Sequence, residues 1–263
     1  MAYLAKILLY PIKSLDGVEA EQATVLPSGP LQYDREFAIV DAQGRFVNAK
    51  RHLKIHSLRA NFSLTERVIH LQLPPSNLYQ VFHLEQEQEQ LAASLSGFFG
   101  FSVKLRQNTN MGFPDDTNSP GATVISTATL KEVASWFPGV SVEEIRRRLR
   151  ANIEIGGVPA FWEDRLFTDS GETVSFQVGD VQFLGVQPCQ RCVVPTRDSY
   201  LGEAYPNFQK IFLQQRQATL PSWVAASRFN HFYKLSVNTR LPASEAGKTI
   251  KVGDNIEILQ LQS

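Results

Sequence analysis

The hydrophobic residues of this chain fall mostly into short runs rather than into long helical stripes. In the first third of the chain these runs are rich in β-branched and aromatic residues, and turn-forming residues separate them, which predicts β-strands. Asp41-Ala42-Gln43-Gly44 is typical of a hairpin turn, because Gly44 can adopt a positive φ. The strands predicted in this part of the chain are residues 5–10, 23–26, 37–40 and 67–73.

The middle of the chain contains the clearest helix signals. Ser126 or Thr127 can cap a helix that continues to about residue 137, where Pro138-Gly139 ends it. Ser141-Val142-Glu143-Glu144 has the spacing of a capping box and predicts a second helix through residue 149. Shorter helices are predicted at residues 91–95 and 206–217.

Strands predominate again in the second half of the chain. A loop rich in Asn, Asp, Pro and Gly, residues 108–121, is the best candidate for a domain junction or a mobile active-site loop. Many short strands with few helices favour a mainly β (α+β) fold of β-barrel type, and the chain has no G-x-G-x-x-G or Walker A motif. The remaining strands are predicted at residues 123–125, 152–155, 173–178, 181–186, 233–238 and 255–261.

Composition narrows the function classes. The 263 residues are 43% hydrophobic, which indicates a folded core, and their formal net charge is zero, which argues against a nucleic-acid partner. No apolar run reaches transmembrane length, and Lys6 interrupts the apolar segment near the N-terminus. We therefore expect a soluble cytoplasmic protein that binds neither nucleic acid nor membranes.

The only two cysteines, Cys189 and Cys192, form one C-x-x-C motif, and four interpretations are open. A structural zinc site needs four ligands, and no second cysteine pair is present. A thioredoxin-like centre needs a helix after the pair, whereas Val193-Val194-Pro195 favours none. The pair can be two buried structural thiols, or one thiolate can bind a metal centre that brings its other ligands. Arg191 lies between the cysteines, where it can lower a thiol pKa.

Pro188-Cys189-Gln190-Arg191-Cys192 resembles the C-x-R-C segment of the MOSC (molybdenum cofactor sulfurase C-terminal) family, which includes the mitochondrial amidoxime-reducing components. In family members with this segment the second cysteine binds molybdenum, and the matching residue is Cys192. Further segments resemble family motifs in the same order along the chain. These are Tyr10-Pro11-Ile12-Lys13-Ser14, Asp34-Arg35-Glu36-Phe37, Arg150-Ala151-Asn152-Ile153, Phe161-Trp162-Glu163-Asp164 and Ile250-Lys251-Val252-Gly253-Asp254.

The resemblance implies a fold and a cofactor. Residues 1–107 would form an N-terminal β-barrel-like domain and residues 108–263 the MOSC β-barrel domain, with the molybdenum cofactor (Mo-molybdopterin) in the cleft between them. Cys192 would bind the metal, and Asp198 would lie nearby as a candidate proton carrier. The other residues that match cofactor contacts of the family are Lys13, Ser14, Arg35, Ser126, Thr127, Arg150 and Asn152.

The resemblance also implies a molybdenum-dependent oxidoreductase that reduces small N-hydroxylated substrates. The chain has neither a four-cysteine cluster site nor a dinucleotide fingerprint, so electrons would arrive from a separate ferredoxin-like or flavoprotein partner. The alternative is a carrier of the cofactor or of persulfide sulfur without reductase turnover. A binding module without turnover is the third class.

Each candidate residue also has a purely structural interpretation. Lys13 can be a solvated turn residue, and Arg35 can pair with Asp34 or Glu36 at the surface. Ser126 and Thr127 can act only as helix caps, and Asp198 can be a turn residue. The run Arg146-Arg147-Arg148 is interpreted as an exposed helix face and is left out of the predicted site.

Overall fold

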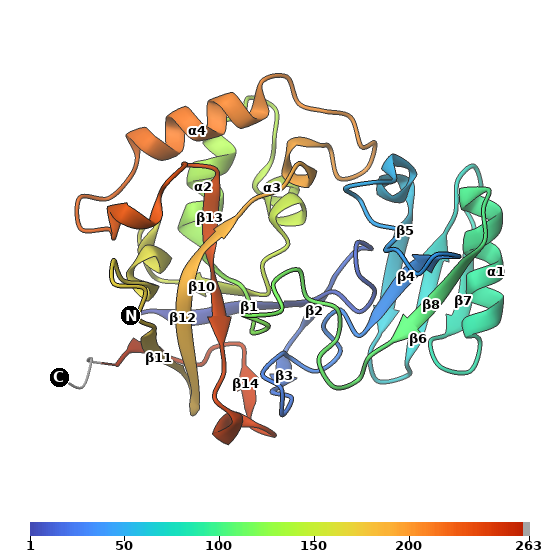
Figure 1. The fold of residues 1–263 in the computed structure, drawn as a ribbon, viewed down its shortest axis with the longest axis horizontal. Coiled ribbons are helices and arrows are strands. Elements are labelled where there is room, and N and C mark those ends of the chain that lie inside the picture. Colours follow the sequence, from blue (N-terminus) through green and yellow to red (C-terminus); the bar gives the residue numbers. More distant parts are fainter. Residues whose placement is uncertain (260–263) are drawn as a thin grey trace.

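The computed structural model describes residues 1–259, in which strands outnumber helices. This composition confirms the predicted mainly β (α+β) fold. The largest sheet is mostly antiparallel, with one parallel pair between β9 and β10 (Figure 1). From edge to edge its strands are β15 (Ile256–Ile258), β11 (Val174–Val178), β12 (Val181–Gln190), β13 (Lys234–Arg240), β9 (Val124–Ser126), β10 (Ile153–Gly156), β1 (Tyr3–Leu9) and β2 (Val18–Ala20).

The N-terminal strands belong to this large sheet. In β1, Leu4, Ile7 and Leu9 are buried, and the strand pairs with β10 through Leu4 opposite Ile155. Likewise, β3 (Gln22–Thr24) pairs with β14 (Thr249–Lys251). Hydrogen-bonded strand pairs therefore join residues on the two sides of the domain boundary predicted at residue 107. The division into two domains stays a prediction.

A second unit lies beside the large sheet and contains only residues from the first half of the chain (Figure 1). Leu91, Leu95 and Phe99 line the buried side of α1 (Gln88–Phe99), which packs against strand residues such as Ile39 and Ile69. Helix α1 ends at Gly100, whose φ is 81°. The strands of this unit are β4 (Phe37–Asp41), β5 (Arg59–Ser63), β6 (Val68–Gln72), β7 (Tyr79–His83) and β8 (Val103–Gln107).

Three helices cover one side of the large sheet: α2 (Thr127–Ser135), α3 (Val142–Leu149) and α4 (Phe208–Ala218) (Figure 1). The side chains of Ser126 and Ser141 accept backbone N–H bonds at the starts of α2 and α3, which confirms both predicted caps. The rings of Phe137 and Phe208 stack at 4.1 Å between centroids and join α4 to the end of α2. Short 3₁₀ helices are η1 (Leu53–Ser57), η2 (Trp162–Leu166), η3 (Val194–Thr196), η4 (Ala226–Arg228) and η5 (Ala243–Glu245).

The predicted elements occur in the structure with shifted ends. The predicted strand at residues 255–261 is β15, and its expected end at Leu261 lies outside the described residues. Strands β2, β5, β7, β8 and β14 were not predicted. None of the helices within residues 1–259 has the length and apolar character needed to cross a membrane.

Candidate functional site

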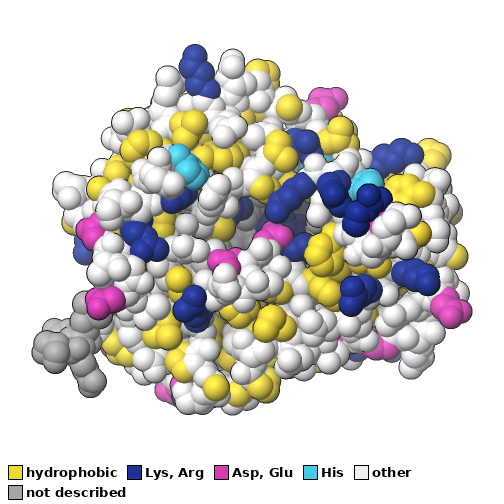
Figure 2. Space-filling view, in the orientation of Figure 1, with side chains coloured by type: hydrophobic (Ala, Val, Ile, Leu, Met, Phe, Trp, Pro, Cys, Tyr) yellow, Lys and Arg dark blue, Asp and Glu magenta, His cyan; other side chains and the backbone are white. Residues whose placement is uncertain are grey.

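A cavity of about 1050 Å³ lies between the large sheet, helix α3 and the second unit. Its lining contains eleven lysine and arginine residues but only six aspartate and glutamate residues, although the whole chain has no net charge. Figure 2 shows lysine and arginine side chains gathered beside a hollow in this face of the molecule. A concave, cationic site of this size suits an anionic ligand.

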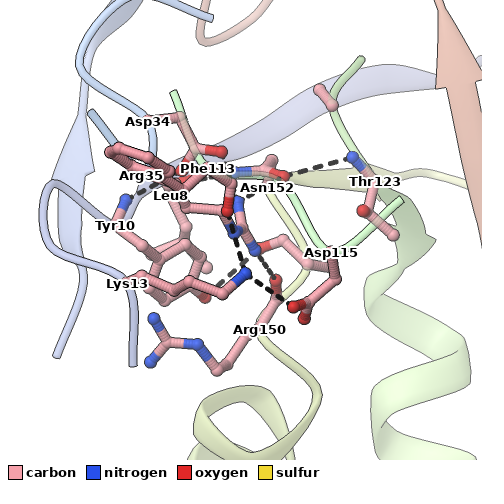
Figure 3. A network of polar contacts seen from close by, with 12 residues as sticks. Leu8, Tyr10, Lys13, Asp34, Arg35, Phe113, Asp115, Thr123, Arg150 and Asn152 are labelled. Carbon is pink, nitrogen blue, oxygen red and sulfur yellow. Dashed lines mark hydrogen bonds and ion pairs between the residues drawn. The ribbon is translucent and has the colours of Figure 1, made fainter. Parts of the chain in front are cut away.

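Tyr10 and two arginines form the centre of one wall (Figure 3). The guanidinium carbons of Arg35 and Arg150 lie 5.1 Å and 4.0 Å from the centroid of the Tyr10 ring. Burial raises the pKa of Tyr10 to about 12, so its hydroxyl stays neutral. Arg150 Nη1 donates to the carbonyl of Leu15 at 2.6 Å, whereas its buried Nη2 has no partner within residues 1–259. Arg150 therefore holds an unused donor in a site where burial lowers its pKa.

Arg35 is held by its neighbours more completely than Arg150. It pairs with Asp34 and donates to the side-chain oxygen of Asn152 and the carbonyl of Arg150, each at 3.3 Å. Asn152 in turn donates to the carbonyl of Leu8 at 3.0 Å. These bonds fix the Arg35 side chain before any ligand arrives, and Asn152 acts mainly as its support.

Lys13 connects this wall to the loop at residues 108–121 (Figure 3). Its Nζ donates to the Phe113 carbonyl at 2.8 Å and to the Asp115 carboxylate at 2.6 Å. Burial alone would raise the pKa of Asp115, but the Lys13 charge outweighs it and lowers that pKa to about 2. A Cβ on Gly112 would lie 2.7 Å from the Asp34 carbonyl oxygen, so only glycine lets the loop pass this close. The predicted loop therefore forms part of the cavity wall.

Three of the predicted cofactor-binding residues have left-handed backbone conformations. Ser14, Arg35 and Arg150 have φ values of 72°, 50° and 55°. For residues other than glycine such conformations cost roughly 1–3 kcal/mol each, and they concentrate at functional sites. Arg150 occupies the C-cap of α3, a position that usually prefers glycine. The positions with strained backbone therefore coincide with positions whose residues line the cavity.

The cysteine pair lies at the end of β12, on another part of the cavity wall. Both thiols are half-buried, and the backbone N–H of Val194 donates to Cys192 Sγ at 3.5 Å. Arg191 Nη1 donates to Cys189 Sγ at 3.3 Å, and its Nη2 donates to the Leu149 carbonyl at 2.5 Å. The arginine between the cysteines therefore contacts Cys189, whereas no side chain among residues 1–259 hydrogen-bonds to Cys192 Sγ.

Three of the predicted site residues lie outside the lining of this cavity. Ser126 and Thr127 do not line the cavity: Ser126 is fully buried and caps α2, and the hydroxyl of Thr127 faces Glu154 at 3.4 Å. Asp198 does not line it either: its Oδ1 accepts the backbone N–H groups of Tyr200 and Leu201 in a turn, and its Oδ2 lies 3.7 Å from Nη2 of the lining residue Arg148. The remaining predicted residues line one cavity: Lys13, Ser14, Arg35, Arg150, Asn152 and Cys192.

Several cationic residues of the cavity were not predicted. The run Arg146-Arg147-Arg148 is not an exposed helix face, because all three residues line the cavity and only 5% of Arg148 is exposed. Successive residues on a helix point about 100° apart, so three adjacent arginines cannot share one solvent-facing side, and the sequence contained that signal. The other unpredicted cations and one imidazole come from separate segments: Lys50, His56, Arg59, Arg191, Arg197 and Lys234.

The fold and the cavity define a mainly β protein with an accessible thiol in a cationic cleft. Two family models match the chain: the MOSC N-terminal beta barrel domain over residues 1–140 and the MOSC domain over residues 121–257. The chain therefore belongs to the MOSC domain family, whose members are associated with molybdenum cofactor binding. The search of curated proteins found no match.

Proposed function

We propose that this protein binds the molybdenum cofactor in the cavity and reduces N-hydroxylated compounds with electrons from a partner protein. The observation that carries the proposal is the set of buried donors without acceptors beside an accessible thiol. In the described part of the chain, Arg150 Nη2 and Arg191 Nε both lack partners, and both residues line the cavity with Cys192. Unpaired buried donors are costly, and a phosphate or a pterin ring supplies the acceptors that they lack.

The residues present fit the cofactor's chemical parts. Arg150, with Lys13 and Arg35 beside it, would hold anionic and pterin acceptors. Cys192 would supply one soft thiolate ligand, which the Val194 N–H stabilises. Within residues 1–259 no group of three or more His, Cys, Asp or Glu side chains is placed to hold a metal, so the other metal ligands would come from the cofactor.

The proposed reaction converts R–NH–OH, two electrons and two protons into R–NH₂ and water. When bound, the cofactor supplies the two-electron redox chemistry. The chain contributes a cavity whose walls orient the substrate and whose Lys13–Asp115 pair holds the 108–121 loop over the site. A ferredoxin-like or flavoprotein partner remains the proposed electron source, since the sequence has no cluster or dinucleotide motif of its own.

The test uses molybdenum-loaded protein, a reduced viologen and benzamidoxime. We expect benzamidine to form, and Cys192→Ala to yield none because the metal loses its protein ligand. Cys189→Ala is the matched control, because Cys189 contacts Arg191 instead, and it should retain most activity. Equal loss in both variants would contradict Cys192 as the sole ligand.

One observation favours a second candidate, a sulfur carrier. The Arg191 guanidinium lies on Cys189 Sγ, where a cation stabilises a thiolate or a persulfide. Protein that releases thiocyanate on cyanide treatment but reduces no N-hydroxylated compound would support the carrier and reject the reductase.

A further inference from the structure

A second group of side chains lines the same cavity, and the proposed cofactor contacts do not use it. It consists of His56 in η1, Arg59 in β5 and Arg197 just after η3. Only 8% of His56 is exposed, and its buried Nε2 has no hydrogen-bond partner among residues 1–259. A ligand atom or an ordered water can satisfy an unpartnered nitrogen of this kind in a cavity wall.

The surroundings of His56 are almost entirely cationic. Burial and the charges of Arg197, Arg59 and Arg150 lower the pKa of His56, and a hydrogen bond with the Ala49 backbone opposes them. Arg197 Nη1 donates to the Ala49 carbonyl at 2.7 Å, which ties the segment after Cys192 to the segment before His56. A negatively charged group here would relieve the repulsion among these side chains.

Among residues 1–259, Asp16 is the carboxylate that pairs with this group: its Oδ1 lies 3.4 Å from Arg59 Nη1, while Arg59 Nη2 donates to the carbonyls of His56 and Ser199. Glu144 and Asp198 pair instead with Arg148, at 2.6 Å and 3.7 Å. Neither Asp198 nor Glu144 lines the cavity. The side of the group formed by His56 and Arg197 therefore remains open to an anion.

Tyr200 holds two of the cations at this end of the cavity. The guanidinium carbons of Arg59 and Arg147 lie 4.5 Å and 4.7 Å from the centroid of its ring. Because one arginine comes from β5 and the other from α3, the ring joins the two sides of the cleft. Each guanidinium also has a carboxylate partner at 3.4 Å, Asp16 for Arg59 and Glu143 for Arg147.

We propose that His56, Arg59 and Arg197 form a subsite for an anionic oxygen group, a carboxylate or a phosphate, on the substrate. The inference rests on the proposed function and narrows its substrates to N-hydroxylated compounds that carry such a group. The cofactor's own phosphate has the same chemistry, and the experiment separates the two sources.

The experiment compares 4-carboxybenzamidoxime with benzamidoxime as ligands of the molybdenum-loaded protein. Isothermal titration gives the two dissociation constants, and viologen-driven turnover gives the two kcat/KM values. We expect the wild type to prefer the carboxylated compound by about ten- to a hundredfold, the range of one charge-assisted hydrogen bond. His56→Gln and Arg197→Gln should each reduce this preference about tenfold. Arg45→Gln is the charge-matched control, because Arg45 is exposed, pairs with Asp41 and lies outside the cavity.

Each outcome decides one question. Equal affinities in the wild type, or an unchanged preference in both variants, would overturn the subsite. Loss of molybdenum from His56→Gln would assign the group to the cofactor's phosphate and also overturn it. Preferential binding without turnover of either compound would reject the reductase and leave the subsite standing. Turnover of both compounds without any preference would support the reductase and overturn the subsite.

Discussion

Replacing Glu163 with glutamine should make the protein more stable at neutral and alkaline pH. Only 1% of Glu163 is exposed, its Oε1 has no partner among residues 1–259, and its Oε2 accepts the Thr129 hydroxyl at 3.1 Å. Burial, together with the neighbouring Asp164 charge, raises the pKa of Glu163 to about 7. A buried, incompletely hydrogen-bonded carboxylate costs free energy whenever it is ionised in the folded state.

The sign follows from proton linkage. Below pH 4.5 Glu163 is protonated in both states, so it brings no pH-dependent loss. As the pH rises from 4.5 to about 7, the unfolded chain releases this proton while the folded chain keeps it, so the free energy of unfolding falls. The shift from 4.5 to about 7 corresponds to about 3 kcal/mol, reached near pH 7 and constant above it.

Urea unfolding of wild type and Glu163→Gln at several pH values measures the effect, because other titrating groups cancel in the difference. The stability gain of the variant should grow from pH 4.5 to 7 and then level off. Glu245→Gln should show the opposite sign. Burial alone would raise the Glu245 pKa, but hydrogen bonds from Lys248 and the Gln182 backbone lower it, so glutamine loses stability above pH 4.5. A Glu163→Gln difference that is independent of pH, or a variant less stable at pH 8, would refute the reasoning.

Three further predictions concern the cavity wall. Arg150→Met should lower molybdenum per chain at limiting cofactor about ten- to a hundredfold, because the cofactor loses the Nη2 donor; unchanged occupancy would reject Arg150 as an anchor. This variant should also lose about 1.5–3 kcal/mol of stability, because the charge-assisted bond to the Leu15 carbonyl is lost together with the Tyr10 contact. Arg35→Met should instead lower the free energy of unfolding by about 3–5 kcal/mol, because Asp34 is left buried without its cation, and an unshifted thermal midpoint would contradict this. Asp115→Asn should speed amide hydrogen exchange in residues 113–121, because the loop loses its ion pair, and exchange equal to the wild type would show that the pair does not hold the loop.

The local elements could be predicted because their signals are local. Ser126 and Ser141 cap the helices that follow them, and the buried residues of β11 alternate as its sequence pattern predicts. Strand pairing could not be predicted in the same way, because β1 pairs with a strand about 150 residues later in the chain. That partnership depends on which apolar faces fit together across the core, and a run of residues does not contain this information.

The site was predicted only where side-chain chemistry and position coincide. Cys192 and Arg150 carry groups that suit the cofactor, and the fold brings both to one cavity. Ser126 has suitable chemistry as well, but its hydroxyl accepts the Thr129 N–H inside the core. His56 carried no sequence signal, since a single histidine becomes informative only when its burial and its missing partner are known.

The net charge of the whole chain differs from the charge of the residues that line the cavity. A formal net charge of zero argued against a polyanionic partner, and it also concealed the cationic cavity. The cations come from segments that are far apart in the sequence, including Lys13, Arg59, Arg150 and Arg197, and only folding brings them together. Because they line a concave site with low-dielectric walls, their field acts on small anions that enter it and is screened within about 8–10 Å outside it. The same charges therefore favour a small anionic ligand and give little attraction to a long polyanion at the surface.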